Sequence, residues 1–184
     1  MNNILHSSES NEWYTPPEVV DLVETIFGDC IHLDPASNLR ANQIVKARRF
    51  FSKAQDGLNQ DWSQYQNIFN NPPYGRGTGK WIDKALASTP PTIMLLNATP
   101  GRQWFAKLID SDQLSWLYFF RKRIRFLDPV NLEPQTSPTH DNVLIGVRTP
   151  VDCQEVFRFV ENHESDRLGG WFVLPDEGVV TWHD

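Results

Sequence analysis

Short apolar runs alternate with amphipathic stretches along most of this chain, and that alternation restricts the possible folds more than any other feature of the sequence. The run at 92–99, TIMLLNAT, is apolar almost throughout, which is typical of a central strand in a parallel sheet. The stretch at 79–88, GKWIDKALAS, places its apolar residues on one side of a helix. Strands alternating with short helices predict an α/β fold with a mainly parallel sheet and helices on both faces.

The same periodicities locate the remaining elements. Helices are predicted at 16–28, 37–47, 79–88 and 102–110, and strands at 30–34, 48–52, 66–71, 92–99, 114–120 and 142–147. Three of these strands end in a polar residue, namely Asp34, Asn71 or Asn97. Because ligands of open α/β sheets bind outside the carboxyl ends of the strands, we expect a site where these three residues meet.

The chain length fits one domain, because 184 residues can bury a sizeable core. The polar residues 1–10 are expected to form a flexible N-terminus, and 11–150 the main domain. Residues 151–184 are expected to be a C-terminal extension packed on the same domain, with a helix followed by a terminal hairpin. The sequence assigns no role to this extension.

Cysteine and histidine usage excludes several classes of protein. The two cysteines lie far apart and the five histidines are scattered, so we expect neither a disulfide scaffold nor a metal site. This usage fits a reducing cytosol. No signal peptide and no apolar run of membrane-spanning length is present, which predicts a cytoplasmic protein without membrane association.

The charges of the chain give two opposing indications about whether it binds nucleic acid. A net charge of −6 argues against it, because a basic face supplies most non-specific affinity. The basic residues are clustered, however, and local charge can outweigh the sum. One cluster consists of Lys46, Arg48 and Arg49, and the other of Arg121, Lys122, Arg123 and Arg125. Each is either a solvated face or a surface that binds nucleic acid.

The glycine-rich stretch at 75–81, GRGTGKW, is not a phosphate loop. Such a loop needs a glycine five residues before its Gly-Lys pair and Ser or Thr after the lysine. Tyr74 occupies the first position and Trp81 the second. We expect these glycines to form a flexible turn before the helix.

The tetrapeptide Asn71-Pro72-Pro73-Tyr74 follows an apolar strand. Its prolines fix φ and push each preceding residue toward extended geometry, so the backbone is stiff. Such a segment is either an ordinary turn or a site that holds a small group in fixed geometry. Its place at a strand end favours the site.

This tetrapeptide resembles the catalytic signature of class I methyltransferases that modify exocyclic or amide nitrogens. The resemblance implies that the Asn71 side-chain oxygen and the Pro72 carbonyl accept the two hydrogens of a target amine. The lone pair of that nitrogen then leaves the ring plane and attacks the methyl group of S-adenosylmethionine in line, with Tyr74 stacked on the base. Positioning and prearranged dipoles would do most of the catalysis.

Five segments, in this order, resemble the phage-type DNA N6-adenine methyltransferases, the small Dam-like family of phages and prophages. They span roughly 11–147 and are Glu12 to Pro16, Leu33 to Ser37, Asp56 to Leu58, Asn71 to Gly75 and Arg121 to Phe126. The resemblance implies a Rossmann-like methyltransferase fold, S-adenosylmethionine as cofactor, and double-stranded DNA as partner. Its target adenine would have to flip out of the duplex.

The resemblance also implies roles for single residues. Asp34 would face the amino group of the cofactor's methionine part. Asp56 would either accept from the cofactor's adenine amine or simply form an Asp-Gly turn. The full cofactor set would be Trp13, Thr15, Pro16, Asp34, Pro35, Asp56 and Asn71, the catalytic set Asn71, Pro72, Pro73 and Tyr74, and the DNA-binding set Arg76, Arg102, Arg121, Lys122, Arg123 and Arg125.

Some features depart from the family pattern or leave alternatives open. No acidic residue follows the predicted strand at 48–52 to hold the ribose hydroxyls of the cofactor, and Ala36 stands where the family often has cysteine. The same tetrapeptide occurs in methyltransferases of protein glutamine amides and of RNA bases, and the acidic pI suits a protein substrate. A catalytically inactive nucleic-acid-binding module is the third alternative. The recognition sequence and the oligomeric state do not follow from the sequence.

Overall fold

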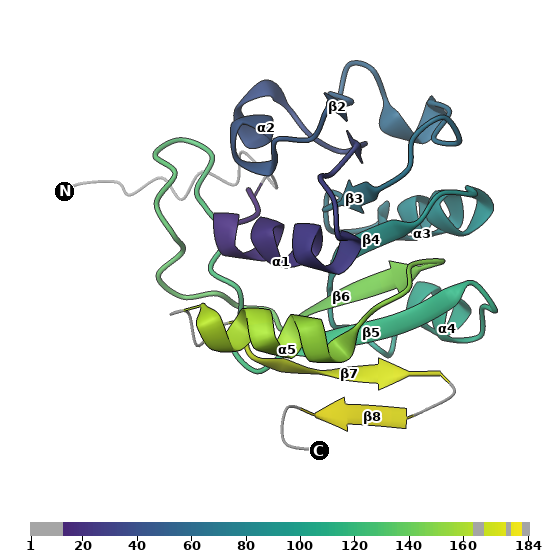
Figure 1. Ribbon diagram of the computed structural model, residues 1–184. Helices are drawn as coiled ribbons and strands as arrows, with labels where there is room; N and C mark the ends of the chain where they lie inside the picture. Colours follow the sequence, from purple (N-terminus) through teal and green to yellow (C-terminus); the bar gives the residue numbers. More distant parts are fainter. Residues whose placement is uncertain (1–12, 164–167, 176–177, 182–184) are drawn as a thin grey trace.

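A single eight-stranded sheet organises the molecule (Figure 1). The computed structural model describes residues 13–163, 168–175 and 178–181, so the predicted flexible segment 1–10 lies outside the described residues. The strand order is β2-β1-β3-β4-β6-β5-β7-β8. The strands are β1 Leu33–Asp34, β2 Arg49–Phe50, β3 Ile68–Asn70, β4 Thr92–Asn97, β5 Leu114–Phe120, β6 Asn142–Val147, β7 Gly170–Leu174 and β8 Gly178–Thr181. The helices are α1 Pro17–Phe27, α2 Leu39–Val45, the 3-10 turn η1 Gly57–Asn59, α3 Thr78–Ala87, α4 Gln103–Ile109 and α5 Cys153–Asn162.

The direction of the strands changes in the middle of the sheet. β2, β1, β3 and β4 pair in parallel, and every pairing from β4 to β8 is antiparallel. The α/β class is confirmed, but the predicted parallel surroundings of residues 92–99 hold on one side of β4 only. A continuous apolar run reports burial on both faces and carries no information about the direction of the neighbouring strand.

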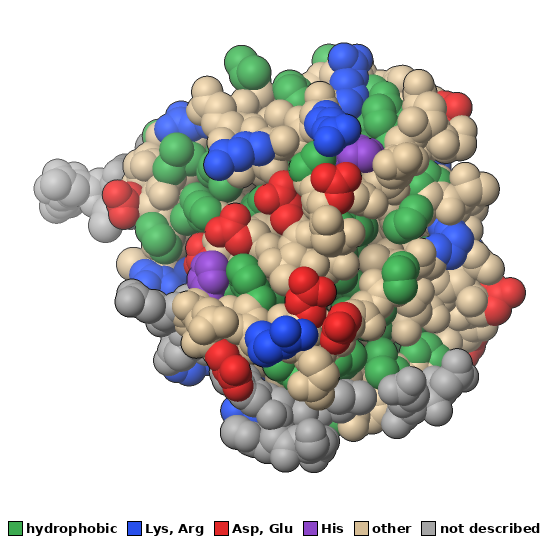
Figure 2. Space-filling model, in the orientation of Figure 1, with side chains coloured by type: hydrophobic (Ala, Val, Ile, Leu, Met, Phe, Trp, Pro, Cys, Tyr) green, Lys and Arg blue, Asp and Glu red, His purple; other side chains and the backbone are tan. Residues whose placement is uncertain are grey.

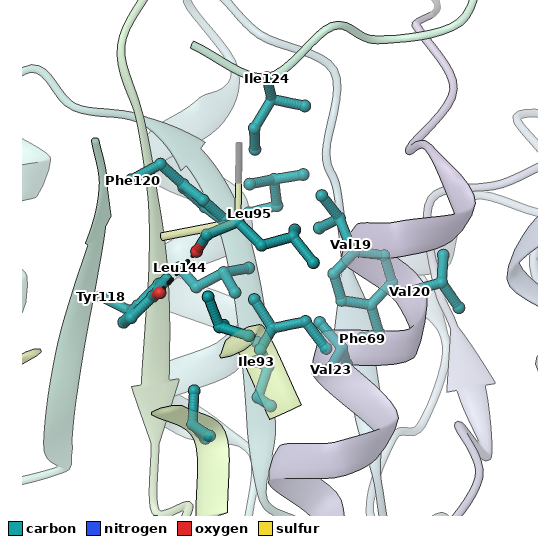
Figure 3. Close-up of a cluster of buried hydrophobic side chains, with 14 of the residues drawn as sticks. Val19, Val20, Val23, Phe69, Ile93, Leu95, Tyr118, Phe120, Ile124 and Leu144 are labelled. Atoms are coloured by element: carbon teal, nitrogen blue, oxygen red, sulfur yellow. Dashed lines mark hydrogen bonds between the residues drawn. The ribbon is translucent and has the colours of Figure 1, made fainter. Parts of the chain in front are cut away.

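Helices cover both faces of the sheet, as predicted. Figure 1 shows α1 and α5 on one face and α3 and α4 on the other. In Figure 3, Val19 and Val23 of α1 point toward the sheet residues Phe69, Ile93 and Leu95, all five of which are buried. Fixing α1 against the sheet also fixes the segment that precedes it.

The segment after residue 150 continues the same fold. β7 pairs with β5, and α5 lies beside α1. The Trp116 indole of β5 donates to the Thr149 carbonyl at 2.7 Å, which anchors the chain where it enters this part. The predicted helix and terminal hairpin correspond to α5 and to β7 with β8.

The chain reverses its course across the sheet at β1. It runs from β1 to β2 on one side, then returns to β3 on the other side of β1. Such a switch point opens a crevice at the carboxyl ends of the two strands that flank it. Here those ends carry Asp34 and Asn71.

Candidate active site

Asn71 is held by the segment that precedes α1. Its side-chain nitrogen donates to the Thr15 hydroxyl oxygen at 3.1 Å and to the Trp13 carbonyl at 3.3 Å. A carbonyl oxygen only accepts, so the nitrogen must face this segment. The side-chain oxygen of Asn71 is therefore left to face the crevice.

Tyr74 is fixed from two directions. Its hydroxyl donates to the Leu95 carbonyl of β4 at 3.3 Å, and its ring meets Phe126 edge-on at 6.2 Å between centroids. Burial raises the pKa of the Tyr74 phenol far above its ordinary value, so the group stays protonated. Tyr74 can offer a rigid aromatic wall, and it cannot act as a base.

A cavity of about 540 Å³ lies at the switch point between β1 and β3. That volume falls within the usual range for small-molecule sites. Six of the seven residues predicted to bind the cofactor line it, and Pro16 instead caps the start of α1. The lining also includes residues to which the sequence assigned no binding role, namely Tyr14, Ser37, Asn38, Phe51, Ser52, Lys53, Gly57 and Trp81.

Asp34 is the buried acid of this smaller cavity, with a relative exposure of 4%. Burial raises the pKa of its carboxyl to about 6, and the hydrogen bond from the Ala36 N–H at 3.2 Å opposes that rise. Near neutral pH the group is therefore an anion in a poorly hydrated place. It would gain a favourable interaction from any ligand that brings a positive charge.

Asp56 forms a local turn. Its carboxylate accepts from the Leu58 N–H at 3.3 Å and from the Asn59 side chain at 2.7 Å, and it caps η1. The next residue lies against the opposite wall, since a Cβ on Gly57 would stand 1.9 Å from the Pro35 carbonyl oxygen. Only glycine allows this approach, so Gly57 sets the width of the smaller cavity at this point.

A second cavity of about 1020 Å³ lies on the other side of Tyr74. Trp13 and Tyr74 line both cavities, so these two side chains form the shared boundary. The described lining of the larger cavity contains Arg76 and Arg102 and no acidic residue. The remaining lining residues include Thr78, Asn97, Gln103, Trp104, Ile124, Phe126, His140 and Asn142.

The residues predicted to bind DNA divide into three groups. Arg76 and Arg102 line the larger cavity. Arg123 pairs with Asp141 at 2.9 Å, and the Arg125 guanidinium donates to the Gln135 carbonyl. These two arginines thus tie the two arms of the 121–141 connection together, a role the sequence could not separate from phosphate binding. Arg121 and Lys122 follow β5 and border neither cavity.

One further cluster contains possible metal ligands, although the sequence predicted none. Ligand atoms of Asp29, Cys30 and His32 lie within 4.8 Å of one another, in the loop before β1. This loop is at the amino end of the strand, away from the residues that line the two cavities. Within the described part of the chain, no helix is both long and apolar enough to cross a bilayer.

The chain is similar to a known protein family and to solved structures. The crystal structure of a dimethyladenosine transferase from Plasmodium falciparum aligns with a TM-score of 0.45 and 11% identity, covering 80% of this chain and 65% of that one. No curated protein matches the chain. The family described as DNA N-6-adenine-methyltransferase (Dam) matches residues 3–170, which extends past both ends of the predicted resemblance at 11–147. Because this match covers most of its length, the chain belongs to the DNA N-6-adenine-methyltransferase (Dam) family.

Proposed function

We propose that this protein transfers a methyl group from S-adenosylmethionine to the N6 amine of adenine in double-stranded DNA, and that the target base flips out of the duplex. One observation carries the proposal. Two cavities of opposite charge character share a wall made by Trp13 and Tyr74, and Asn71 stands beside that wall. A donor and an acceptor that occupy the two cavities would meet at Asn71.

The smaller cavity suits a cationic donor. Asp34 and Asp56 contribute its acidic groups and Lys53 a basic one, and no cation among the described residues offsets the burial of Asp34. Asp34 would hold the ammonium group of the donor, while Trp13 and Phe51 offer apolar contacts. When bound, the cofactor supplies an electrophilic methyl group on a sulfonium centre.

The catalytic work falls to atoms that only accept hydrogen bonds. Asn71 turns its oxygen toward the crevice, and no N–H of the described residues occupies the Pro72 carbonyl. These two oxygens would accept both hydrogens of the adenine amine and bring its lone pair out of the ring plane. The Tyr74 and Phe126 rings would hold the base for in-line attack, so positioning replaces general-base catalysis.

The acidic net charge of the protein does not oppose a DNA partner, because the charges are segregated. Acidic side chains gather over α1 and α5 on the face seen in Figure 2. The sequence of α1 contains Glu18, Asp21 and Glu24 and no basic residue. The described lining of the larger cavity carries arginines and no acids. Phosphates approaching that cavity would therefore meet a locally positive surface.

Flipping of the target base follows from the same arrangement. Asn71 lines a cavity, and an amine that is stacked inside a duplex cannot enter such a cavity. By family resemblance we further propose a phage or prophage setting, a cytoplasmic location, and protection of DNA from restriction as its purpose.

The proposal is tested by mass spectrometry of nucleosides from the nucleic-acid samples and of peptides from the protein sample. The protein is incubated with S-adenosylmethionine and unmethylated double-stranded DNA, and parallel samples contain RNA or a protein extract. We expect N6-methyladenine in DNA only, and none with Asn71→Ala, whose cofactor affinity should remain measurable by calorimetry. Methyl transfer to RNA or to glutamine would instead assign another substrate class, and normal DNA methylation by Asn71→Ala would refute the assigned chemistry.

A further inference from the structure

Two asparagines face each other across neighbouring strands at the base of the larger cavity. Asn97 is the last residue of β4 and Asn142 the first of β6, and the antiparallel register places them opposite one another. The Asn142 side-chain nitrogen donates to the Asn97 side-chain oxygen at 3.2 Å. Both residues line the cavity, and Asn142 is 2% exposed.

This pairing determines what Asn97 can offer to a ligand. Its side-chain oxygen is engaged by Asn142, and no hydrogen bond from its side-chain nitrogen to another described residue is found. An amide nitrogen carries two donors and accepts nothing. Asn97 therefore presents N–H groups in a cavity that it helps to line.

The sheet register places these donors within reach of a base bound at Asn71. Asn70 of β3 is opposite Met94 of β4, so Asn71 lies beside Leu95 and Asn97 is two residues further along. Two residues of strand advance about 7 Å, and neighbouring strands lie about 4.8 Å apart. The separation of the two backbones is thus comparable to the width of a purine.

We propose that Asn97 is a specificity-determining residue, whose side-chain N–H donates to N1 of the target adenine, the ring nitrogen beside the exocyclic amine, while Asn142 holds Asn97 in place. The proposal rests on the proposed function and names the group that selects the base. Adenine offers only acceptors at its ring nitrogens, whereas guanine has an N–H at the ring position beside its exocyclic oxygen. A buried donor facing that N–H would be left unpaired, and such mismatches reject the wrong ligand strongly.

The test replaces single ring nitrogens of the substrate. Single-turnover methylation is measured on an oligonucleotide that the wild-type protein methylates, with 1-deaza-, 3-deaza- or 7-deazaadenine at the target position. We expect the wild-type rate to fall at least tenfold on 1-deazaadenine and less on the other two analogues. A wild-type rate that is unchanged on 1-deazaadenine overturns the proposal without the need for any variant.

Asn97→Asp supplies the matching variant. Its carboxylate still accepts from Asn142, so the pair is kept while the donor is lost. We expect a rate on adenine at least tenfold below wild type, and no further loss on the analogue to which wild type is sensitive. Asn162→Asp on α5, whose side chain bonds to the Arg158 carbonyl, makes the same change remote from both cavities and should keep the wild-type profile.

The outcomes separate this inference from the proposed function. A wild-type protein that methylates no DNA adenine refutes the proposed function itself. A wild-type protein that methylates adenine, together with an Asn97→Asp variant that still discriminates against the sensitive analogue, refutes only the role of Asn97.

Discussion

The side-chain nitrogen of Asn71 lies 3.1 Å from the hydroxyl oxygen of Thr15, and this bond helps to decide which atom of Asn71 a substrate can meet. Thr15 is 3% exposed and directly precedes the residue that caps α1. The orientation of the proposed catalytic amide is thus determined by a segment that is distant in sequence. The Trp13 carbonyl, at 3.3 Å, supports the same orientation.

Removing the Thr15 hydroxyl should slow the reaction while the donor still binds. In Thr15→Val the Asn71 amide loses one of its two acceptors, so its oxygen faces the crevice for a smaller fraction of the time. We expect kcat to fall about fivefold, which corresponds to the loss of one hydrogen bond of about 1 kcal/mol. Thr15→Ser keeps the acceptor and should stay close to wild type in single-turnover kinetics. Equal losses in both variants would indicate a packing role instead.

Tyr74 should tolerate the loss of its hydroxyl and not of its ring. Tyr74→Phe removes the bond to the Leu95 carbonyl, and we expect kcat to change by less than about threefold. Tyr74→Leu removes the aromatic wall between the cavities and should slow transfer about 10- to 100-fold, which corresponds to one base–aromatic stacking contact. A Tyr74→Phe protein as slow as Tyr74→Leu would show that the phenol itself takes part.

Asp34 should destabilise the ligand-free protein at high pH. Its folded-state pKa of about 6 lies above the value of about 3.9 expected when unfolded, so the folded state binds more protons between these values. The free energy of unfolding should therefore decrease as the pH rises from about 4 to about 6. The full penalty above pH 6 is about 3 kcal/mol.

Asp34→Asn should remove this penalty. We expect a higher free energy of unfolding than wild type at pH 8, by about 1 to 3 kcal/mol, and little difference at about pH 3.5, below the unfolded-state pKa, measured by urea denaturation. The same variant should bind S-adenosylmethionine weakly at pH 8. Wild-type affinity should decline below pH 6, where the carboxyl takes up its proton. A pH-independent difference in stability would contradict the assigned pKa.

Arg76 and Arg102 should contribute to the salt dependence of DNA binding. Each phosphate contact adds about −0.9 to the slope of log affinity against log salt concentration. Replacing either residue by alanine should therefore reduce the slope by about 1, as measured by fluorescence anisotropy with a labelled duplex. Arg158→Ala on α5 is the matched control and should leave the slope unchanged, because that residue lies far from the larger cavity.

Most of the site could be predicted because parallel strands bring their carboxyl ends together. Asp34 and Asn71 follow neighbouring strands, and both line the smaller cavity. Asn97 also lines a cavity, but Asn142 was missed for a physical reason. β6 runs antiparallel to β4, so the amino end of β6 lies at the site. The expectation that ligands bind at the carboxyl ends of strands therefore does not point to Asn142.

The basic clusters show a second limit of sequence reasoning. A guanidinium can bind a phosphate or satisfy the carbonyls of a returning chain, and the sequence carries no sign of which partner is near. Arg123 and Arg125 contact the chain that returns at 135–141, whereas Arg76 and Arg102 border the larger cavity. The sequence predicted that these residues are positively charged. Only the structure shows which group lies next to each guanidinium.

The strap formed by residues 13–15 touches every part of the proposed reaction. Trp13 borders both cavities, the backbone of Tyr14 pairs with Leu127 in the 121–141 connection, and Thr15 orients Asn71. Steady-state kinetics on variants of this strap should therefore show the Michaelis constants of both substrates moving together. Such covariation would indicate that one segment supports both binding sites. It would not show that a residue of the strap contacts DNA.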